Sequence, residues 1–116
     1  MLDPLTDRRG DPQRGAAVAV SSDKGNCIIC HAIPIPDVPE GWFGDLGPSL
    51  EGVGSRLNAA ELRLRIVDPK RISPDTIMPS YHVTEGLHRV QSQYVGKPIL
   101  TAQEVEDLIA YLETLK

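Results

Sequence analysis

The chain has 116 residues and a formal net charge of −4, which allows one small domain and argues against nucleic acid or an anionic membrane surface as a partner. The acidic balance favours a partner with a basic rim instead. No apolar run approaches the roughly 18 residues of a membrane span, and the charged opening does not resemble a signal peptide, so we expect no membrane span.

Residues 1–10 are polar and charged, and we expect them to form an N-terminal arm ahead of a single domain over residues 11–116. Asp11 followed by Pro12 has the form of a helix N-cap with proline at the first helical position. Small apolar residues continue this pattern, and Gly25-Asn26 is a typical helix end. The sequence therefore predicts a first helix from about residue 12 to residue 24.

The next segment, Cys27-Ile28-Ile29-Cys30-His31, is the most informative motif in the chain. Two cysteines three positions apart lie on neighbouring positions of one helix face. A histidine directly behind the second cysteine is typical of covalent c-type haem attachment. We therefore expect Cys27 and Cys30 to bind one haem c and His31 to be an axial ligand of its iron. Such a group would also enlarge a core with only one Trp, one Phe and three Tyr.

Three other interpretations of this motif are weaker. A thioredoxin-type dithiol expects a βαβ frame, which the surrounding residues do not predict. A zinc site would have to combine His31 with His82 or His88, without a second cysteine or histidine pair at zinc-finger spacing. A disulfide between positions i and i+3 would stabilise little and leave His31 unexplained.

The rest of the chain predicts helices separated by long loops, an all-α class. Residues 32–47 contain too many prolines and glycines for a regular element. A capping box at Asn58 and Glu61 predicts a helix from about residue 59 that ends before Asp68-Pro69. Thr101 and Glu104 form a second capping box ahead of the last helix. That helix carries an apolar stripe of Val105, Leu108, Ile109, Leu112 and Leu115.

The second axial position decides what such an iron does, because two ligands favour electron transfer and an open site favours ligand binding or peroxidase-like chemistry. Met78 is the methionine that follows the motif, in a stiff segment beside Pro79. We predict that Met78 is the second metal ligand, since a thioether stabilises reduced iron. His82 and His88 remain the alternatives, and a five-coordinate haem enzyme or sensor would require that Met78 does not bind.

This order of motifs resembles the class I cytochromes c over residues 11–116, with about four helices and long loops around one covalently attached haem. Gly47-Pro48-Ser49-Leu50 resembles the family segment in which a proline carbonyl accepts the Nδ1 proton of the haem histidine. The resemblance therefore implies that Pro48 is the partner of His31. It also places Gly15 and Tyr111 where the first and last helices cross.

Closer detail is similar to the SoxX family, the monohaem subunits of SoxAX thiosulfate-oxidising complexes. The similar segments are Gly25-Asn26-Cys27, Gly52-Val53-Gly54-Ser55-Arg56, Met78-Pro79-Ser80-Tyr81 and Gly96-Lys97-Pro98-Ile99-Leu100-Thr101, with an insertion over about residues 82–100.

The resemblance implies an electron-transfer subunit with a SoxA-like cytochrome partner and a soluble electron acceptor. It implies no catalytic residue in this chain, because both thiols are used by the haem. A free-standing soluble carrier cytochrome is the alternative. Because bacterial haem is joined to this motif outside the cytoplasm, we expect a periplasmic protein whose leader has been removed.

Overall fold

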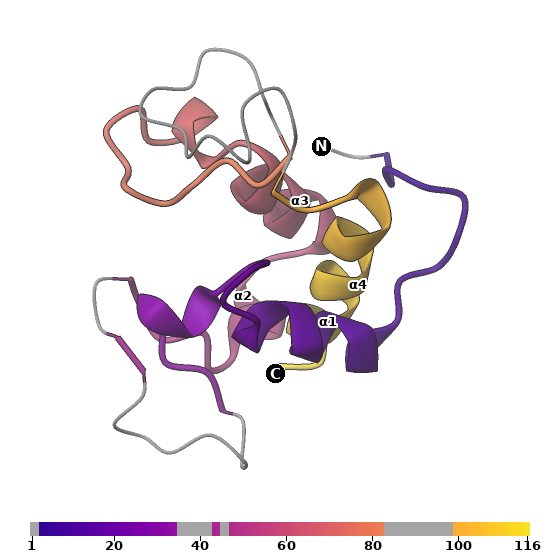
Figure 1. Ribbon diagram of the computed structural model, residues 1–116, viewed down its shortest axis with the longest axis horizontal. Coiled ribbons are helices and arrows are strands. Elements are labelled where there is room, and N and C mark those ends of the chain that lie inside the picture. Colours follow the sequence, from indigo (N-terminus) through magenta and orange to yellow (C-terminus); the bar gives the residue numbers. More distant parts are fainter. Residues whose placement is uncertain (1–2, 35–42, 45–46, 83–98) are drawn as a thin grey trace.

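The computed structural model describes residues 3–34, 43–44, 47–82 and 99–116. In chain order its elements are α1 (Pro12–Val20), η1 (Cys27–Ile29), α2 (Val53–Arg56), α3 (Ala59–Val67), η3 (Pro69–Arg71) and α4 (Ala102–Glu113), where η denotes a short 3-10 helix. No strand occurs among these described residues. Figure 1 shows the helices joined by long connections, which confirms the predicted all-α class.

Helix α1 begins where the sequence predicts but ends earlier. The Asp11 carboxylate accepts hydrogen bonds from the backbone N–H groups of Gln13 (2.8 Å) and Arg14 (3.3 Å). The helix stops at Val20, so the predicted end at Gly25 is wrong. Ser21 turns to extended backbone, and its carbonyl accepts hydrogen bonds from Lys24 (3.2 Å) and Asn26 (3.0 Å) in a turn. Serine and aspartate favour such turns over helix interiors because their side chains compete for backbone groups.

Both predicted capping boxes are present. Asn58 and Glu61 exchange side-chain to backbone hydrogen bonds at the start of α3, and Thr101 and Glu104 do so at the start of α4. Helix α3 ends at Val67, two residues before Pro69, as predicted. Each box satisfies two N–H groups that a helix start would otherwise leave unpaired, so local sequence alone sets these two starting points.

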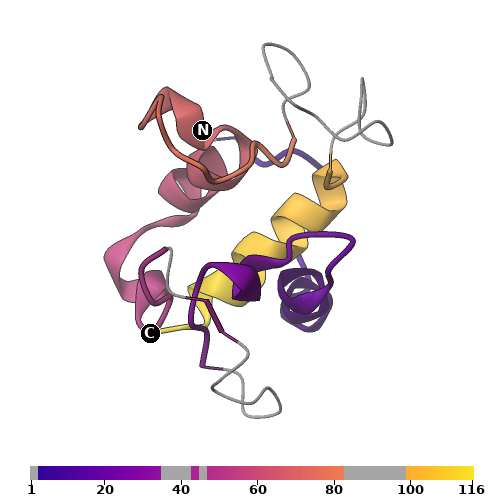
Figure 2. The same cartoon turned by 60° about the vertical axis from the view of Figure 1, so that its left-hand side comes forward.

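Helices α1 and α4 cross closely, and Figure 2 shows α4 running across α1, which is seen nearly end-on. A Cβ atom on Gly15 would overlap the backbone carbonyl of Asp107 and approach the Cβ of Tyr111 to 2.8 Å. Only glycine lets the two backbones come this near. This confirms the crossing at Gly15 and Tyr111 that the class I resemblance implies.

A buried carboxylate joins the two crossing helices. Asp107 accepts hydrogen bonds from Arg14 Nε (3.0 Å), the backbone N–H of Asp11 (2.9 Å) and Gln103 Nε2 (2.9 Å). Burial acts to raise the pKa of Asp107, but the hydrogen bonds and the Arg14 charge outweigh it and hold the pKa below its ordinary value. The ionised form of Asp107 therefore stabilises the folded protein.

A buried ion pair joins α3 to α4, and sequence patterns did not reveal it. Arg63 Nε and Nη2 each lie 2.9 Å from a carboxylate oxygen of Glu106, in a two-pronged arrangement. The exposed fractions of these side chains are 5% and 8%. The backbone N–H of Leu5 also donates to Glu106, over 3.2 Å. The N-terminal segment thus contacts α4, while its boundary with the domain at residue 10 stays a prediction.

Some predicted features lie outside the described residues. These include most of the loop over residues 32–47 and most of the insertion at 82–100, with His88. Within the described part of the chain, no helix has the length and apolar character needed to cross a membrane.

Candidate functional site

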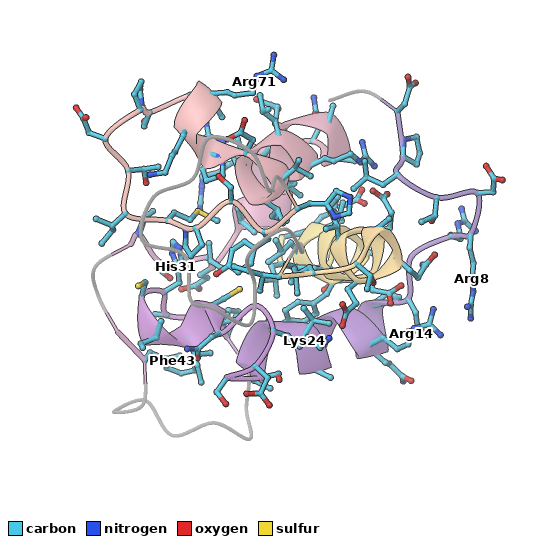
Figure 3. All side chains as sticks on the ribbon, turned by 45° about the horizontal axis from the view of Figure 1, so that its top comes forward. Arg8, Arg14, Lys24, His31, Phe43 and Arg71 are labelled. Carbon is cyan, nitrogen blue, oxygen red and sulfur yellow. The ribbon has the colours of Figure 1, made fainter. Side chains whose placement is uncertain are left out.

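One cavity of about 830 Å³ brings together the four site residues that the sequence predicts: Cys27, Cys30, His31 and Met78. We call residues 25–31 with 47–50 the His31 wall, and residues 69–81 the Met78 wall. In Figure 1 the salmon segment that holds η3 lies above the purple segment that holds η1. Figure 3 shows the labelled His31 between these two segments.

The two cysteines are presented by a single turn of helix. Asn26 takes the left-handed conformation (φ 46°) and starts η1, and the Cys27 carbonyl accepts hydrogen bonds from the N–H groups of Cys30 (3.2 Å) and His31 (2.9 Å). Residues three apart in a 3-10 turn lie above one another. Burial raises the pKa of Cys27 to about 11, so before haem attachment this side chain is a protonated thiol at neutral pH.

The imidazole of His31 is oriented by a backbone carbonyl. Its Nδ1 atom lies 2.6 Å from the carbonyl oxygen of Pro48, and because a carbonyl only accepts, Nδ1 is the donor. The lone pair of Nε2 is then available for a metal ion. A Cβ atom on Gly47 would overlap the His31 ring, so only glycine fits there. The structure confirms the Pro48 contact that the resemblance implies.

Arg56 supports the loop that carries Pro48. Its Nη1 atom donates to the Glu51 carbonyl (2.6 Å) and Nη2 donates to the Ser49 carbonyl (3.2 Å). Arg56 is the last residue of α2, a four-residue helix. Such a helix is too short to show a hydrophobic periodicity in the sequence. Its only sequence signal is the preceding Gly52, whose φ of 74° favours glycine.

Met78 is half-buried on the Met78 wall and packs against the hydrophobic core. Its backbone N–H donates to Thr76 Oγ1 (3.2 Å), and Lys70 Nζ donates to the Thr76 carbonyl (2.7 Å). These bonds hold a loop without regular structure, as the proline-rich sequence predicts.

The alternative ligand His82 lies elsewhere. Its Nδ1 atom is 2.9 Å from the Leu100 carbonyl, and His82 does not line the cavity. His88 is among the residues that the structure does not describe. Of the residues weighed for the second axial position, the structure brings Met78 to the cavity.

The cavity wall is basic although the chain is acidic. Its described lining includes four cationic side chains and no aspartate or glutamate; the cations are Lys24, Arg56, Arg65 and Lys70. All four residues are exposed, and Lys24 is paired with Glu104 over 3.1 Å, which leaves three cations at the cavity without a carboxylate partner among the described residues. The net charge is a sum over the whole chain and does not show this local excess of positive charge. The excess favours an acidic rather than a basic group at this cavity.

The lining fits a haem c. Two thiols on one turn, an oriented imidazole and a thioether are the donors that such a group needs. Apolar side chains from α2, α3 and α4 cover much of the remaining wall, among them Val53, Leu62, Ile66, Leu108 and Leu112. The cations at the edge suit two propionates. No group of three His, Cys, Asp or Glu side chains arranged for a metal ion occurs within the described ranges.

Comparison with known proteins agrees with this arrangement. The cytochrome c family model matches residues 13–116. Cytochrome c-550 of Bacillus subtilis (strain 168) is 35% identical over 57 residues, which cover 49% of this chain and 42% of that protein's length.

A chain in the crystal structure of SoxXA from P. pantotrophus superposes with a TM-score of 0.88 and 34% identity. The match covers 98% of this chain and 88% of that one. The fold class, the haem c cofactor and the SoxX resemblance expected from sequence are therefore confirmed. The chain belongs to the cytochrome c family and is a SoxX-like, electron-transfer member of it.

Proposed function

We propose that this chain is the electron-transfer subunit of a sulfur-oxidising complex, with Cys27 and Cys30 attaching the haem and His31 and Met78 binding its iron. The observation that carries the ligand assignment is the single cavity that collects two thiols, an oriented imidazole and a thioether. When bound, the haem supplies a centre that accepts and releases one electron at a time.

The residues of the chain act by orientation and by excluding water. The Pro48 carbonyl holds the Nδ1 proton of His31, so that Nε2 faces the cavity as a ligand. The apolar wall lowers the local dielectric, and the thioether of Met78 favours the reduced state. Binding of the iron by both His31 and Met78 would leave small molecules no open site at the metal, which suits electron transfer.

The similarity to SoxXA supports a SoxA-like partner. Joining a carrier-protein cysteine thiol to thiosulfate forms one S–S bond and releases one proton and two electrons, which a redox chain must remove. Both cysteines of this chain are assigned to haem attachment, so the S–S bond forms in another chain. The electrons pass through this chain to a soluble acceptor, and haem attachment outside the cytoplasm makes the periplasm its location.

Replacing Met78 tests the ligand assignment. We expect Met78→Ala to keep its covalent haem, lose any methionine–iron band in the far-red ferric spectrum and show a lower reduction potential. Asp75→Asn is the control, because Asp75 is exposed three residues before Met78 and does not line the cavity, and its spectrum should be unchanged. A Met78→Ala protein with the wild-type ferric spectrum would show that another group binds the iron.

Purification from the native source tests the partner. A larger haem protein that co-purifies at a fixed ratio would support the proposed complex. A clean monomer that exchanges electrons rapidly with several redox proteins would contradict it and support the free-standing carrier.

A further inference from the structure

Tyr81 links the two walls of the cavity. Its side chain is 7% exposed, and its hydroxyl donates a hydrogen bond of 2.5 Å to the carbonyl of Gly25. Tyr81 belongs to the Met78 wall, whereas Gly25 lies two residues before Cys27 on the His31 wall. Burial raises the pKa of Tyr81, so the hydroxyl keeps its proton and remains a donor.

The backbone of Tyr81 is fixed on both sides. Its N–H donates to the Ile66 carbonyl of α3 (3.0 Å), and its carbonyl accepts from the N–H of Leu100 (2.9 Å). The neighbouring Ser80 is also buried, and its Oγ lies 3.3 Å from Asp68 Oδ1. The segment that follows Met78 is thus attached to α3, to the start of α4 and to the haem motif.

The acceptor is equally fixed. The N–H of Gly25 donates to the Val18 carbonyl (3.1 Å), and a Cβ atom on Gly25 would come within 2.9 Å of that oxygen. The Gly25 carbonyl therefore faces Tyr81 from a position set by α1.

The bonds on the other side of Met78 are weaker anchors. The Lys70 to Thr76 contact is exposed, and the Thr76 hydroxyl accepts from Met78 itself over 3.2 Å. Exposed bonds exchange with water at little net cost, whereas a buried bond leaves an unpaired group when it opens. Tyr81 is therefore the firmest side-chain attachment near Met78.

We propose that Tyr81 is a positioning residue for Met78: its buried hydrogen bond to Gly25 holds the Met78 wall against the His31 wall and so strengthens the methionine–iron bond. This inference rests on the proposed ligation by Met78. Displacing Met78 from the iron would then require the Tyr81 bond to Gly25 to open as well.

Imidazole added to the ferric protein measures this effect, because it competes with Met78 for the iron. We expect Tyr81→Phe to bind imidazole about tenfold more tightly than the wild type, since displacement no longer opens a buried hydrogen bond. Tyr111→Phe is the matched control. This variant also removes a tyrosine hydroxyl, but from α4 at the helix crossing, and its imidazole affinity should stay at the wild-type value.

The affinities are compared without denaturant, at equal helical circular dichroism, which separates ligand release from general unfolding. Equal imidazole affinity in Tyr81→Phe and the wild type, while Met78→Ala loses its far-red band, would overturn the role of Tyr81 alone. A Met78→Ala protein that keeps the wild-type spectrum would overturn the proposed ligation itself.

Discussion

The two walls of the cavity are built by different means. The His31 wall draws both cysteines and the histidine from five consecutive residues, and the Pro48 carbonyl lies 2.6 Å from His31 Nδ1. The Met78 wall is a loop that depends on hydrogen bonds to distant segments, such as the 2.5 Å bond from Tyr81 to Gly25. The cysteines and the histidine lie within one turn, so the local sequence determines their placement. The thioether of Met78 is brought to the cavity by tertiary contacts.

Covalent retention of haem is the property in which we expect the two walls to differ most, and removing both cysteines tests it. In the double variant Cys27→Ala with Cys30→Ala, essentially all haem should extract into acidified acetone, because no thioether bond remains. Met78→Ala is the control from the other wall and should retain its haem in the protein fraction. The measurement is the pyridine haemochrome of each fraction. Covalently retained haem in the double variant would refute the assignment of these thiols.

Glu106→Gln tests how α3, which leads into the Met78 wall, is held against α4. Removing the carboxylate that faces the buried Arg63 guanidinium should lower the free energy of unfolding by about 1–3 kcal/mol. Urea denaturation followed by helical circular dichroism measures this loss. Glu51→Gln is the control, because Glu51 is exposed and lies outside α3 and α4. Equal losses in the two variants would show that the buried pair adds nothing.

Gly47→Ala perturbs the His31 wall directly. The added Cβ overlaps the His31 ring, so the loop with Pro48 must shift, at a cost of about 1–3 kcal/mol in unfolding free energy. Ser73→Ala, a small change at an exposed position of the Met78 wall, should have no measurable effect. A Gly47→Ala protein as stable as the wild type in urea would mean that the His31 wall is less tightly packed than the structure indicates.

Acid should have the smallest effect, through the Asp107 site between α1 and α4. Because the pKa of Asp107 is lowered by folding, its contribution is fully present above the unfolded pKa of about 3.9 and is lost as pH falls through the folded value.

Comparing Asp107→Asn with the wild type tests this dependence. The wild type should be more stable in urea at pH 7, and the difference should shrink below about pH 4. Asp7→Asn, at an exposed position of the N-terminal arm, should match the wild type throughout. A difference between Asp107→Asn and the wild type that does not change with pH would contradict the lowered pKa.

Local signals predicted the parts of the molecule that depend on neighbouring residues. The capping boxes of α3 and α4, the η1 turn and the apolar stripe of α4 from Val105 to Leu112 follow from short patterns, because each involves contacts within one or two helical turns. The predicted last member of the stripe, Leu115, lies beyond the end of the helix at Glu113. The predicted end of α1 was wrong because residues 21–26 form a turn around the Ser21 carbonyl instead of extending the helix.

The sequence by itself determined the haem motif, the all-α class and the candidate ligands, because these depend on residue type and short spacing. Only the tertiary structure decided that Arg63 pairs with Glu106 and Tyr81 with Gly25, across 43 and 56 positions of the chain. It also decided that cations gather at the cavity of an acidic protein. Such contacts depend on how the helices pack, and packing is a property of the whole chain.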